Sequence, residues 1–132
     1  MNKMKILKKS KAPRYIREEG ITSYLLASPN TSGAVQMTTT LVEIQPGGKQ
    51  RIHQHRPEQI YFIIEGSGKM TLGNESRLVE KDDCIFIPSN EPHGLENIGQ
   101  TLIKYFSTAA PSFTREELSE LWPLVSESDS NE

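Results

Sequence analysis

One segment, from Pro46 to Gly66, constrains this chain more than any other. Its sequence is PGGKQRIHQHRPEQIYFIIEG, a Pro-Gly-Gly turn followed by His53 and His55 and then by an apolar run. Side chains two residues apart on a strand point to the same face, so these two imidazoles can converge on one ion. Imidazole is the commonest side chain to bind zinc, copper, iron or nickel. An H-x-H pair alone is a weak signal, but the third and last histidine, His93, lies in another motif-like segment, IPSNEPHGLEN.

These two segments resemble the two sequence motifs of the cupin family. In the first motif a glycine precedes an H-x-H pair, and a glutamate and a second glycine follow it. Gly47, His53, His55 and Gly66 stand at the corresponding positions of this chain with matching spacing, and Gln59 replaces the glutamate. The glutamine bears directly on the chemistry of the site.

The second motif contains a glycine, a Pro-x-Gly sequence, a histidine and an asparagine. Pro88, His93 and Asn97 match it in this chain, whereas Asp82 and Asn90 replace its two glycines. Aspartate and asparagine tolerate a positive φ better than most other residues. We therefore expect both replacements to preserve the turns.

The resemblance implies an all-β fold, a single cupin (jelly-roll) β-barrel with one short C-terminal helix. It also implies that the barrel binds one divalent transition metal ion (Ni, Zn, Fe, Cu or Mn) and a small-molecule ligand, and that the chain forms a homodimer. The metal ligands that it implies are His53, His55, Gln59 and His93.

Strand parity bears on the identity of the fourth ligand. If one strand ran from His53 without a bulge, Gln59 and Tyr61 would share the face of the histidine pair, and Glu58 would point to the other side. Pro57 lies between the histidines and this run. A turn at the proline could swing either side chain inward, so Glu58 remains an alternative to Gln59.

The rest of the chain consists of short β-rich runs separated by Gly, Pro and Asn, a pattern that predicts a barrel or a sandwich. One helix is predicted, because Thr114 and Glu117 fit a capping box and Leu118, Leu121 and Trp122 then share a face. The strands that we expect are residues 23–27, 34–45, 59–64, 69–72, 77–79, 84–87, 94–96 and 102–107.

A chain of 132 residues forms one domain, and the absence of an internal repeat excludes a duplicated cupin. We expect a basic lead-in at residues 1–20, the barrel at 21–112, the helix at 113–124 and a disordered acidic tail at 125–132. The basic residues of the lead-in are Lys3, Lys5, Lys8, Lys9, Lys11 and Arg14.

These composition features also suggest what the chain does not bind. No aromatic interleaving or recognition-helix pattern follows the basic residues, so we expect no nucleic-acid partner. No apolar run approaches a membrane span and no segment has the order of a signal peptide, so we expect no membrane association. The single cysteine, Cys84, cannot form an internal disulfide; we expect a cytoplasmic protein with a buried, inert thiol.

Three imidazoles and a carboxamide form a neutral ligand set, so a bound divalent ion keeps its whole charge and is a stronger Lewis acid. Cupins that handle sugar acids look like this, with a glutamine beside three histidines. We therefore favour an enzyme that acts on a small oxygenated or carboxylated molecule, by sugar-acid-like isomerisation or ring opening. The alternatives are a metal-dependent dioxygenase or decarboxylase, and a non-enzymatic cupin that binds a small molecule or metal.

Further residues are candidates for the site. Tyr61 could act as a hydrogen-bond donor or acid, Glu58 as a base at the rim, and Arg51 as a bidentate clamp on a substrate carboxylate. Each also has a structural interpretation, core packing for the tyrosine and a solvated surface position for the two charged residues. The remaining positions that we expect in the core are Met70, Phe86 and Tyr105.

Overall fold

The computed structural model describes residues 3–17 and 19–122. Short β-strands make up most of the regular secondary structure in this part of the chain, with one 3-10 turn at Lys9–Lys11 and one α-helix near the end. The elements are β1 (Arg14–Arg17), β2 (Ile21–Leu25), β3 (Thr38–Ile44), β4 (Glu58–Glu65), β5 (Ser67–Leu72), β6 (Glu75–Glu80), β7 (Cys84–Ile87), β8 (His93–Glu96), β9 (Ile103–Ala110) and α1 (Arg115–Leu121).

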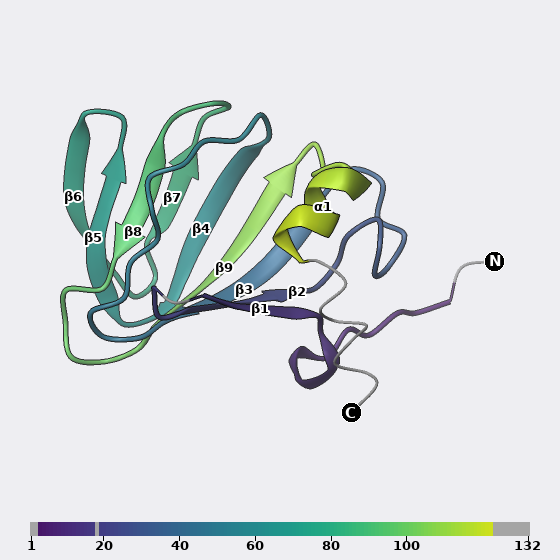
Figure 1. Cartoon of the computed structure of the whole chain (residues 1–132), viewed down its shortest axis with the longest axis horizontal. Coiled ribbons are helices and arrows are strands. Elements are labelled where there is room, and N and C mark those ends of the chain that lie inside the picture. The colour runs from purple at the N-terminus through teal and green to yellow at the C-terminus, as the bar shows by residue number, and fades with distance from the viewer. Residues whose placement is uncertain (1–2, 18, 123–132) are drawn as a thin grey trace.

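The strands form two antiparallel sheets that face each other (Figure 1). The larger sheet has the order β1-β2-β3-β9-β4-β7, and the smaller one has the order β6-β5-β8. Neighbours such as β3 and β9 are far apart in the sequence, which is typical of a jelly roll. The predicted all-β jelly-roll barrel with one short helix is confirmed.

The turns between strands explain three positions of the two motifs. Gly66 has a φ of 86°, and a Cβ atom there would collide with the carbonyl oxygen of Leu102. Asp82 and Asn90 have φ values of 75° and 62°, so both adopt the left-handed conformation for which a glycine is usually needed. The expectation that these two replacements preserve the turns is confirmed.

The inward-facing side chains change character along the central strands. On β3 the buried residues run from Thr38 and Thr40 to Val42 and Ile44. The inward positions of β4 and β9 change in the same direction, because Thr40 pairs with Ser107 and Ile44 pairs with Ile103 in the sheet register. One end of the barrel interior is therefore polar, and the other end is an aliphatic core.

Helix α1 begins with the predicted capping box. The Thr114 hydroxyl accepts from the backbone N–H of Glu117, whose carboxylate accepts from the N–H of Thr114. Leu118 is fully buried against Leu25 and Phe113, with Trp122 packed beside them. The side chain of Leu121 and the predicted tail at residues 125–132 lie outside the described part, as do residues 123 and 124 of the predicted helix.

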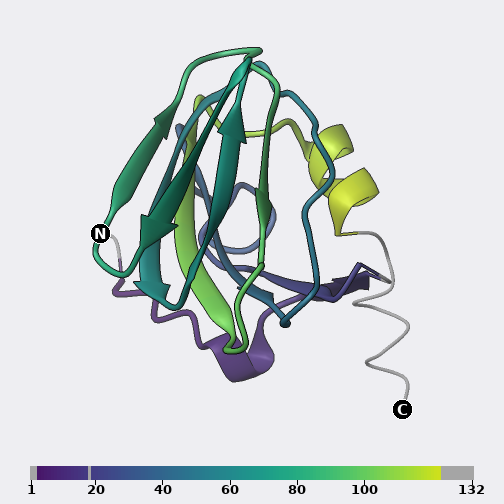
Figure 2. The ribbon, with the colours of Figure 1, turned by 90° about the vertical axis from the view of Figure 1, so that its left-hand side faces the viewer.

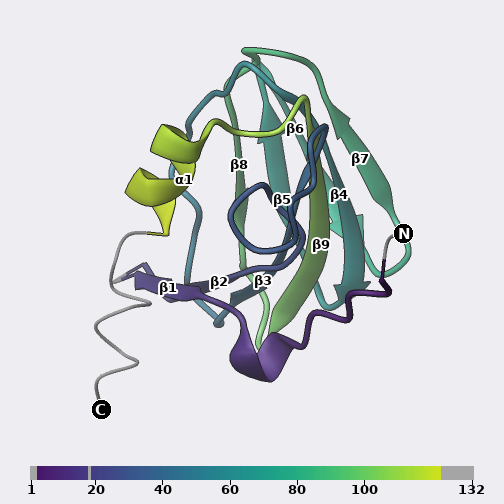
Figure 3. The same cartoon turned by 90° about the vertical axis from the view of Figure 1, so that its right-hand side faces the viewer.

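The helix lies beside the strands, at the end of β9 (Figure 1). Figure 2, in which the smaller sheet faces the viewer, places it to the right of the two sheets. From the opposite side, Figure 3 shows the loop that follows β2 in front of the strands and the helix next to it. No helix in the described residues is long and apolar enough to cross a membrane.

Three expectations differ from the structure. Residues 14–17 belong to the sheet as β1 rather than to a lead-in, because they pair with β2 from Arg17 opposite Ile21 to Arg14 opposite Tyr24. Cys84 is exposed and Phe86 is 52% exposed, so the prediction that they are buried was wrong. Both lie on the outer face of the edge strand β7, where no further layer of the described residues covers them, whereas Met70 and Tyr105 are buried as predicted.

Candidate metal centre

The three histidines come from two segments that face each other. His93 is the first residue of β8, and His53 lies in the connection before β4. An isolated antiparallel bridge joins them: the His53 N–H donates to the His93 carbonyl over 3.0 Å, and the His93 N–H donates back over 2.9 Å. The unbroken strand that parity reasoning assumed from His53 is absent, because β4 begins only at Glu58.

The imidazole rings meet at the polar end of the barrel. The distances between ring centroids are 4.3 Å for His53 and His93, 4.5 Å for His53 and His55, and 5.5 Å for His55 and His93. One ring nitrogen from each histidine lies within 4.8 Å of the other two. Three nitrogen ligands at this spacing can hold a single ion.

The backbone fixes the tautomer of two of these rings. Nδ1 of His53 donates to the Arg51 carbonyl over 2.7 Å, and Nδ1 of His93 donates to the Glu91 carbonyl over 2.8 Å. The proton therefore sits on Nδ1, and the lone pair of Nε2 remains available for a ligand. Nε2 of His93 is buried and has no hydrogen-bond partner among the described residues.

Burial also keeps the rings neutral. It is the main cause that lowers the pKa of His53 to about 4 and that of His55 to about 3. Burial likewise lowers the pKa of His93. At neutral pH all three rings carry lone pairs, which is the protonation state that binds a metal.

Gln59 supplies a fourth polar atom. Its side chain is 7% exposed, and its amide nitrogen donates to the Ser107 hydroxyl over 3.3 Å. The amide oxygen is buried without a partner among the described residues. Glu58 is exposed and points to the opposite face of β4. The geometry thus favours Gln59 over Glu58 as the fourth ligand.

A polar cavity of about 680 Å³ opens next to the histidines. Side chains from several strands line it, including Thr38 and Thr40 of β3, Gln59 of β4 and Ser107 of β9. Phe113 stands at the wall and contacts the His55 ring edge-on, with 5.1 Å between the centroids. The cavity offers space for a small molecule beside the histidine cluster.

Tyr61 lies in the wall of this cavity in a hydrogen-bonded group. Its hydroxyl donates to Gln50 Oε1 over 3.2 Å, and Gln50 Nε2 donates to the Tyr105 hydroxyl over 3.0 Å. The two tyrosine rings stack with 4.2 Å between centroids. Burial raises the pKa of Tyr61 to about 12, so at neutral pH its phenol is a neutral donor.

Sequence reasoning placed Arg51 at the site and overlooked Arg17. The side chain of Arg51 is 80% exposed, and its guanidinium forms an ion pair with Glu19 at 2.8 Å. Arg17 of β1 lines the same cavity as Arg51 and Glu19, together with Trp122 beyond α1. The alternation of charged and apolar residues in RYIR was the available signal for β1, but the surrounding basic residues concealed it.

The described atoms fit a metal ion. Two polar atoms are buried without partners among the described residues: Nε2 of His93, which belongs to the histidine cluster, and Oε1 of Gln59, which lines the same cavity as His53 and His55. Imidazole nitrogen and amide oxygen are ligands of divalent transition metals. Such an ion would give these atoms the partners that the described residues do not provide.

The sequence profile of the family described as "Cupin domain" matches residues 40–108, more than half of the chain. The chain belongs to the cupin family. The protein MJ1618 of Methanocaldococcus jannaschii is 37% identical over 117 residues, which cover 86% of this chain and 94% of that protein. The tetracenomycin polyketide synthase protein TcmJ of Streptomyces glaucescens is 30% identical over 86% of this chain and 76% of its own length.

A solved structure shows the same cupin fold. The polyketide cyclase RemF from Streptomyces resistomycificus superimposes with a TM-score of 0.72, covering 94% of this chain and 98% of that chain at 24% identity. At this level of identity the likeness establishes the fold of the cupin barrel and not its chemistry.

Proposed function

We propose that this cupin binds one divalent transition metal ion through His53, His55, Gln59 and His93 and is an enzyme acting on a small oxygenated or carboxylated molecule. One observation carries the proposal: three imidazole nitrogens lie within 4.8 Å of one another at the edge of a polar cavity. The buried Gln59 oxygen, which lacks a partner among the described residues, supports a fourth ligand there.

When bound, such an ion would supply Lewis acidity toward a substrate oxygen. The surrounding residues contribute binding and orientation. Tyr61 donates its one hydroxyl proton to Gln50 Oε1, and its raised pKa keeps that proton on the phenolic oxygen at neutral pH, so the ring is a fixed, neutral part of the cavity wall. Phe113 covers one side of the His55 ring and limits the access of water there.

The reaction that we favour is an isomerisation or a ring opening of a sugar-acid-like molecule. The neutral ligand set supports it, because no carboxylate lowers the charge of the ion. The relationship with TcmJ, described as a polyketide synthase protein, agrees with a substrate that is small and rich in oxygen. One alternative is an enzyme with dioxygenase or decarboxylase activity. The other is a cupin that binds a small molecule or metal without catalysis.

The test is the metal content of the protein after purification without chelators, measured by mass spectrometry. We expect about one divalent ion per chain in the wild type and almost none in His55→Ala. Thr40→Ala is the matched control, since Thr40 lines the same cavity and is not a ligand. Full metal occupancy in His55→Ala would contradict the proposed site.

The identity of the metal also separates the alternatives. Zinc or another redox-inert ion supports Lewis-acid chemistry, whereas iron or copper supports reactions with oxygen. Wild-type protein that contains no metal and takes up none on addition would overturn the metal-dependent enzyme and leave a metal-free binding barrel.

We also propose that the chain forms a homodimer. The outer face of the larger sheet supports this, since Phe62 and Ile64 of β4 are each 38% exposed and Phe86 of β7 is 52% exposed. Apolar residues grouped on a surface are typical of contacts between subunits. A monomeric mass by light scattering at micromolar concentration would contradict the dimer.

A further inference from the structure

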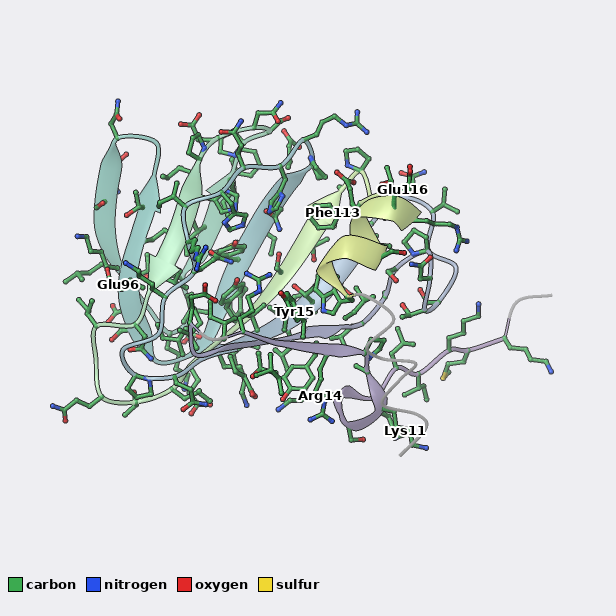
Figure 4. All side chains as sticks on the ribbon, in the orientation of Figure 1. Lys11, Arg14, Tyr15, Glu96, Phe113 and Glu116 are labelled. Carbon is green, nitrogen blue, oxygen red and sulfur yellow. The ribbon has the colours of Figure 1, made fainter. Side chains whose placement is uncertain are left out.

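Arg17 is the last residue of β1 and faces the inside of the barrel. Residues alternate along β1, so Tyr15 and Arg17 are half-buried, whereas Arg14 and Ile16 are exposed. In Figure 4, Arg14 and Tyr15 lie on opposite sides of the β1 ribbon, with Tyr15 on the side of the barrel strands. Arg17 therefore belongs to the wall of the cavity that His53 and His55 of the histidine cluster also line.

The guanidinium of Arg17 has a buried donor without a partner among the described residues. Its Nε atom is buried and makes no hydrogen bond to any described residue. The group is always charged, and a buried donor that lacks a partner is costly. The aromatic ring of Tyr15 lies 5.0 Å from the Arg17 Cζ atom, a cation–π contact that holds the guanidinium in place without using its donors.

The other charged groups of the cavity wall do not neutralise Arg17. The lining contains one carboxylate, Glu19, and that carboxylate is paired with Arg51 at 2.8 Å. The three histidines are neutral at pH 7. Among the described residues that line the cavity, Arg17 therefore carries the charge that is not balanced.

We propose that Arg17 binds the carboxylate of a small anionic substrate whose other oxygens reach the histidine cluster. This inference rests on the proposed metal-dependent function and specifies its substrate class as a carboxylate. A guanidinium presents Nε and a terminal nitrogen in one plane, a geometry that matches the two oxygens of a carboxylate. The charge of Arg17, together with that of a divalent ion bound by the neutral histidines, would favour such an anion over a neutral molecule of equal size.

The hydroxyl groups of the cavity suit the rest of such a molecule. Ser23, Thr40 and Ser107 line the space between the larger sheet and the histidines, and Trp122 lines it on the side of α1. A substrate that carries both a carboxylate and several hydroxyl or carbonyl groups would find partners along the whole cavity. This is why a polyoxygenated acid fits better than a simple fatty acid.

The experiment uses the full chain, labelled with 15N and loaded with zinc, and follows two NMR signals. Trp122 is the only tryptophan in the chain, so its indole N–H gives one signal from the cavity wall. The Nε–H signal of Arg17 is assigned by its loss in Arg17→Gln. The probes are two matched pairs, glucuronate with glucose and benzoate with benzamide, in which only one member carries a carboxylate.

We expect the carboxylates to shift both signals of the wild type, and the neutral partners to leave the Arg17 signal unchanged. Arg17→Gln should weaken the binding of the carboxylate probes by about tenfold or more, the loss expected for a charged hydrogen bond. Arg17→Lys keeps the charge but not the planar pair of donors, so its affinity for the carboxylate probes should fall by less. Arg14→Gln is the matched control on the outer face of the same strand and should bind as the wild type does.

Two results would overturn the inference. In the first, neither carboxylate shifts the Arg17 signal. In the second, Arg17→Gln and Arg17→Lys have amide spectra that show intact folds and bind carboxylates as tightly as the wild type does. Zinc content separates this inference from the proposed function. Zinc uptake combined with Arg17-independent binding overturns the role of Arg17 and leaves the metal site standing. Arg17-dependent binding to protein that takes up no zinc supports the anion site and contradicts the metal-dependent function.

Discussion

The two ends of the barrel interior are built by the same strands but from different side chains. At the open end the inward residues of β3, β9 and β4 are Thr40, Ser107 and Gln59, and they line the cavity. At the closed end the inward residues of the same strands are Ile44, Ile103 and Ile63, each 0–1% exposed. Two stacked tyrosines, Tyr61 and Tyr105, lie between the two ends.

This difference shows how the barrel can keep polar atoms unpaired inside it. The aliphatic end buries its side chains completely and supplies hydrophobic stabilisation. The polar end contains a cavity and buried atoms that lack partners among the described residues, and unpaired atoms of this kind lower stability until a ligand satisfies them. We infer that stability depends mainly on the closed end and that binding depends on the open end.

The largest effect on stability should come from shortening a buried side chain at the closed end. Ile63→Ala removes a fully buried side chain, so we expect the free energy of unfolding to fall by about 2–5 kcal/mol. The metal content of the folded protein should not change. Ile64→Ala, the neighbouring position on the outer face at 38% exposure, should cost less than about 1 kcal/mol. Urea unfolding and metal analysis measure both quantities.

If Ile63→Ala lost its metal while it remained folded, the division of the interior into a stabilising end and a binding end would fail. Equal destabilisation by Ile63→Ala and Ile64→Ala would contradict the assignment of Ile63 to the core.

The second largest effect should be that of pH on stability, through the histidines of the open end. The pKa values of His53 and His55 are lowered from about 6.5 to about 4 and about 3 in the folded chain. As the pH falls from 6.5 toward 4, the unfolded chain takes up protons that the folded chain does not. The stability that these two neutral rings contribute to the metal-stripped protein is therefore fully present above pH 6.5. Below that pH it decreases, by at most about 1.4 kcal/mol per pH unit for each ring. Partial exposure of the rings makes the actual slope smaller.

The measurement is urea unfolding of chelator-treated protein between pH 7.5 and 4.5. His55→Ala removes one of the rings, so its slope should be shallower than that of the wild type, whereas the other titrating groups are common to both proteins. Identical slopes would show that the His55 ring is not kept neutral by burial.

The smallest effect should be the change in metal affinity when the proposed fourth ligand, Gln59, becomes charged. Gln59→Glu should retain the metal and tighten its binding by up to about tenfold, because a carboxylate cancels part of the charge of the ion. Turnover of a substrate should change as well. Glu58→Gln alters the exposed neighbour and should change neither quantity. Competition with a chelator measures the affinity, and loss of metal in Gln59→Glu would indicate another fourth ligand.

Much of the fold follows from local sequence signals. Turn residues delimit most strands, and Asp82 and Asn90 could be expected at positive φ because their side chains tolerate it. The inward face of β4 agrees with the parity prediction, with Gln59 and Tyr61 buried and Glu58 exposed, although the unbroken strand from His53 that the prediction assumed is absent. The capping box of α1 was equally local.

Other features depend on contacts that no local pattern contains. β1 forms because Arg14–Arg17 pairs with β2, and a stretch rich in basic residues does not indicate such a pairing. The exposure of Phe86 follows from the position of β7 at the edge of the sheet, whereas its apolar side chain suggested the core. Arg17 could not be assigned to the site before β1 was recognised, whereas Arg51 was considered because it lies two residues before His53 in the motif.

The bridge between His53 and His93 has a consequence for the rate at which a metal enters. Two backbone hydrogen bonds hold these residues opposite each other, and two further bonds, to the Arg51 and Glu91 carbonyls, hold their rings. The conformational entropy of assembling these two ligands has therefore been lost during folding and is not lost again on binding. An ion can dissociate and rebind without any rebuilding of the protein, and uptake by the stripped barrel should be governed by dehydration of the ion and its passage through the cavity.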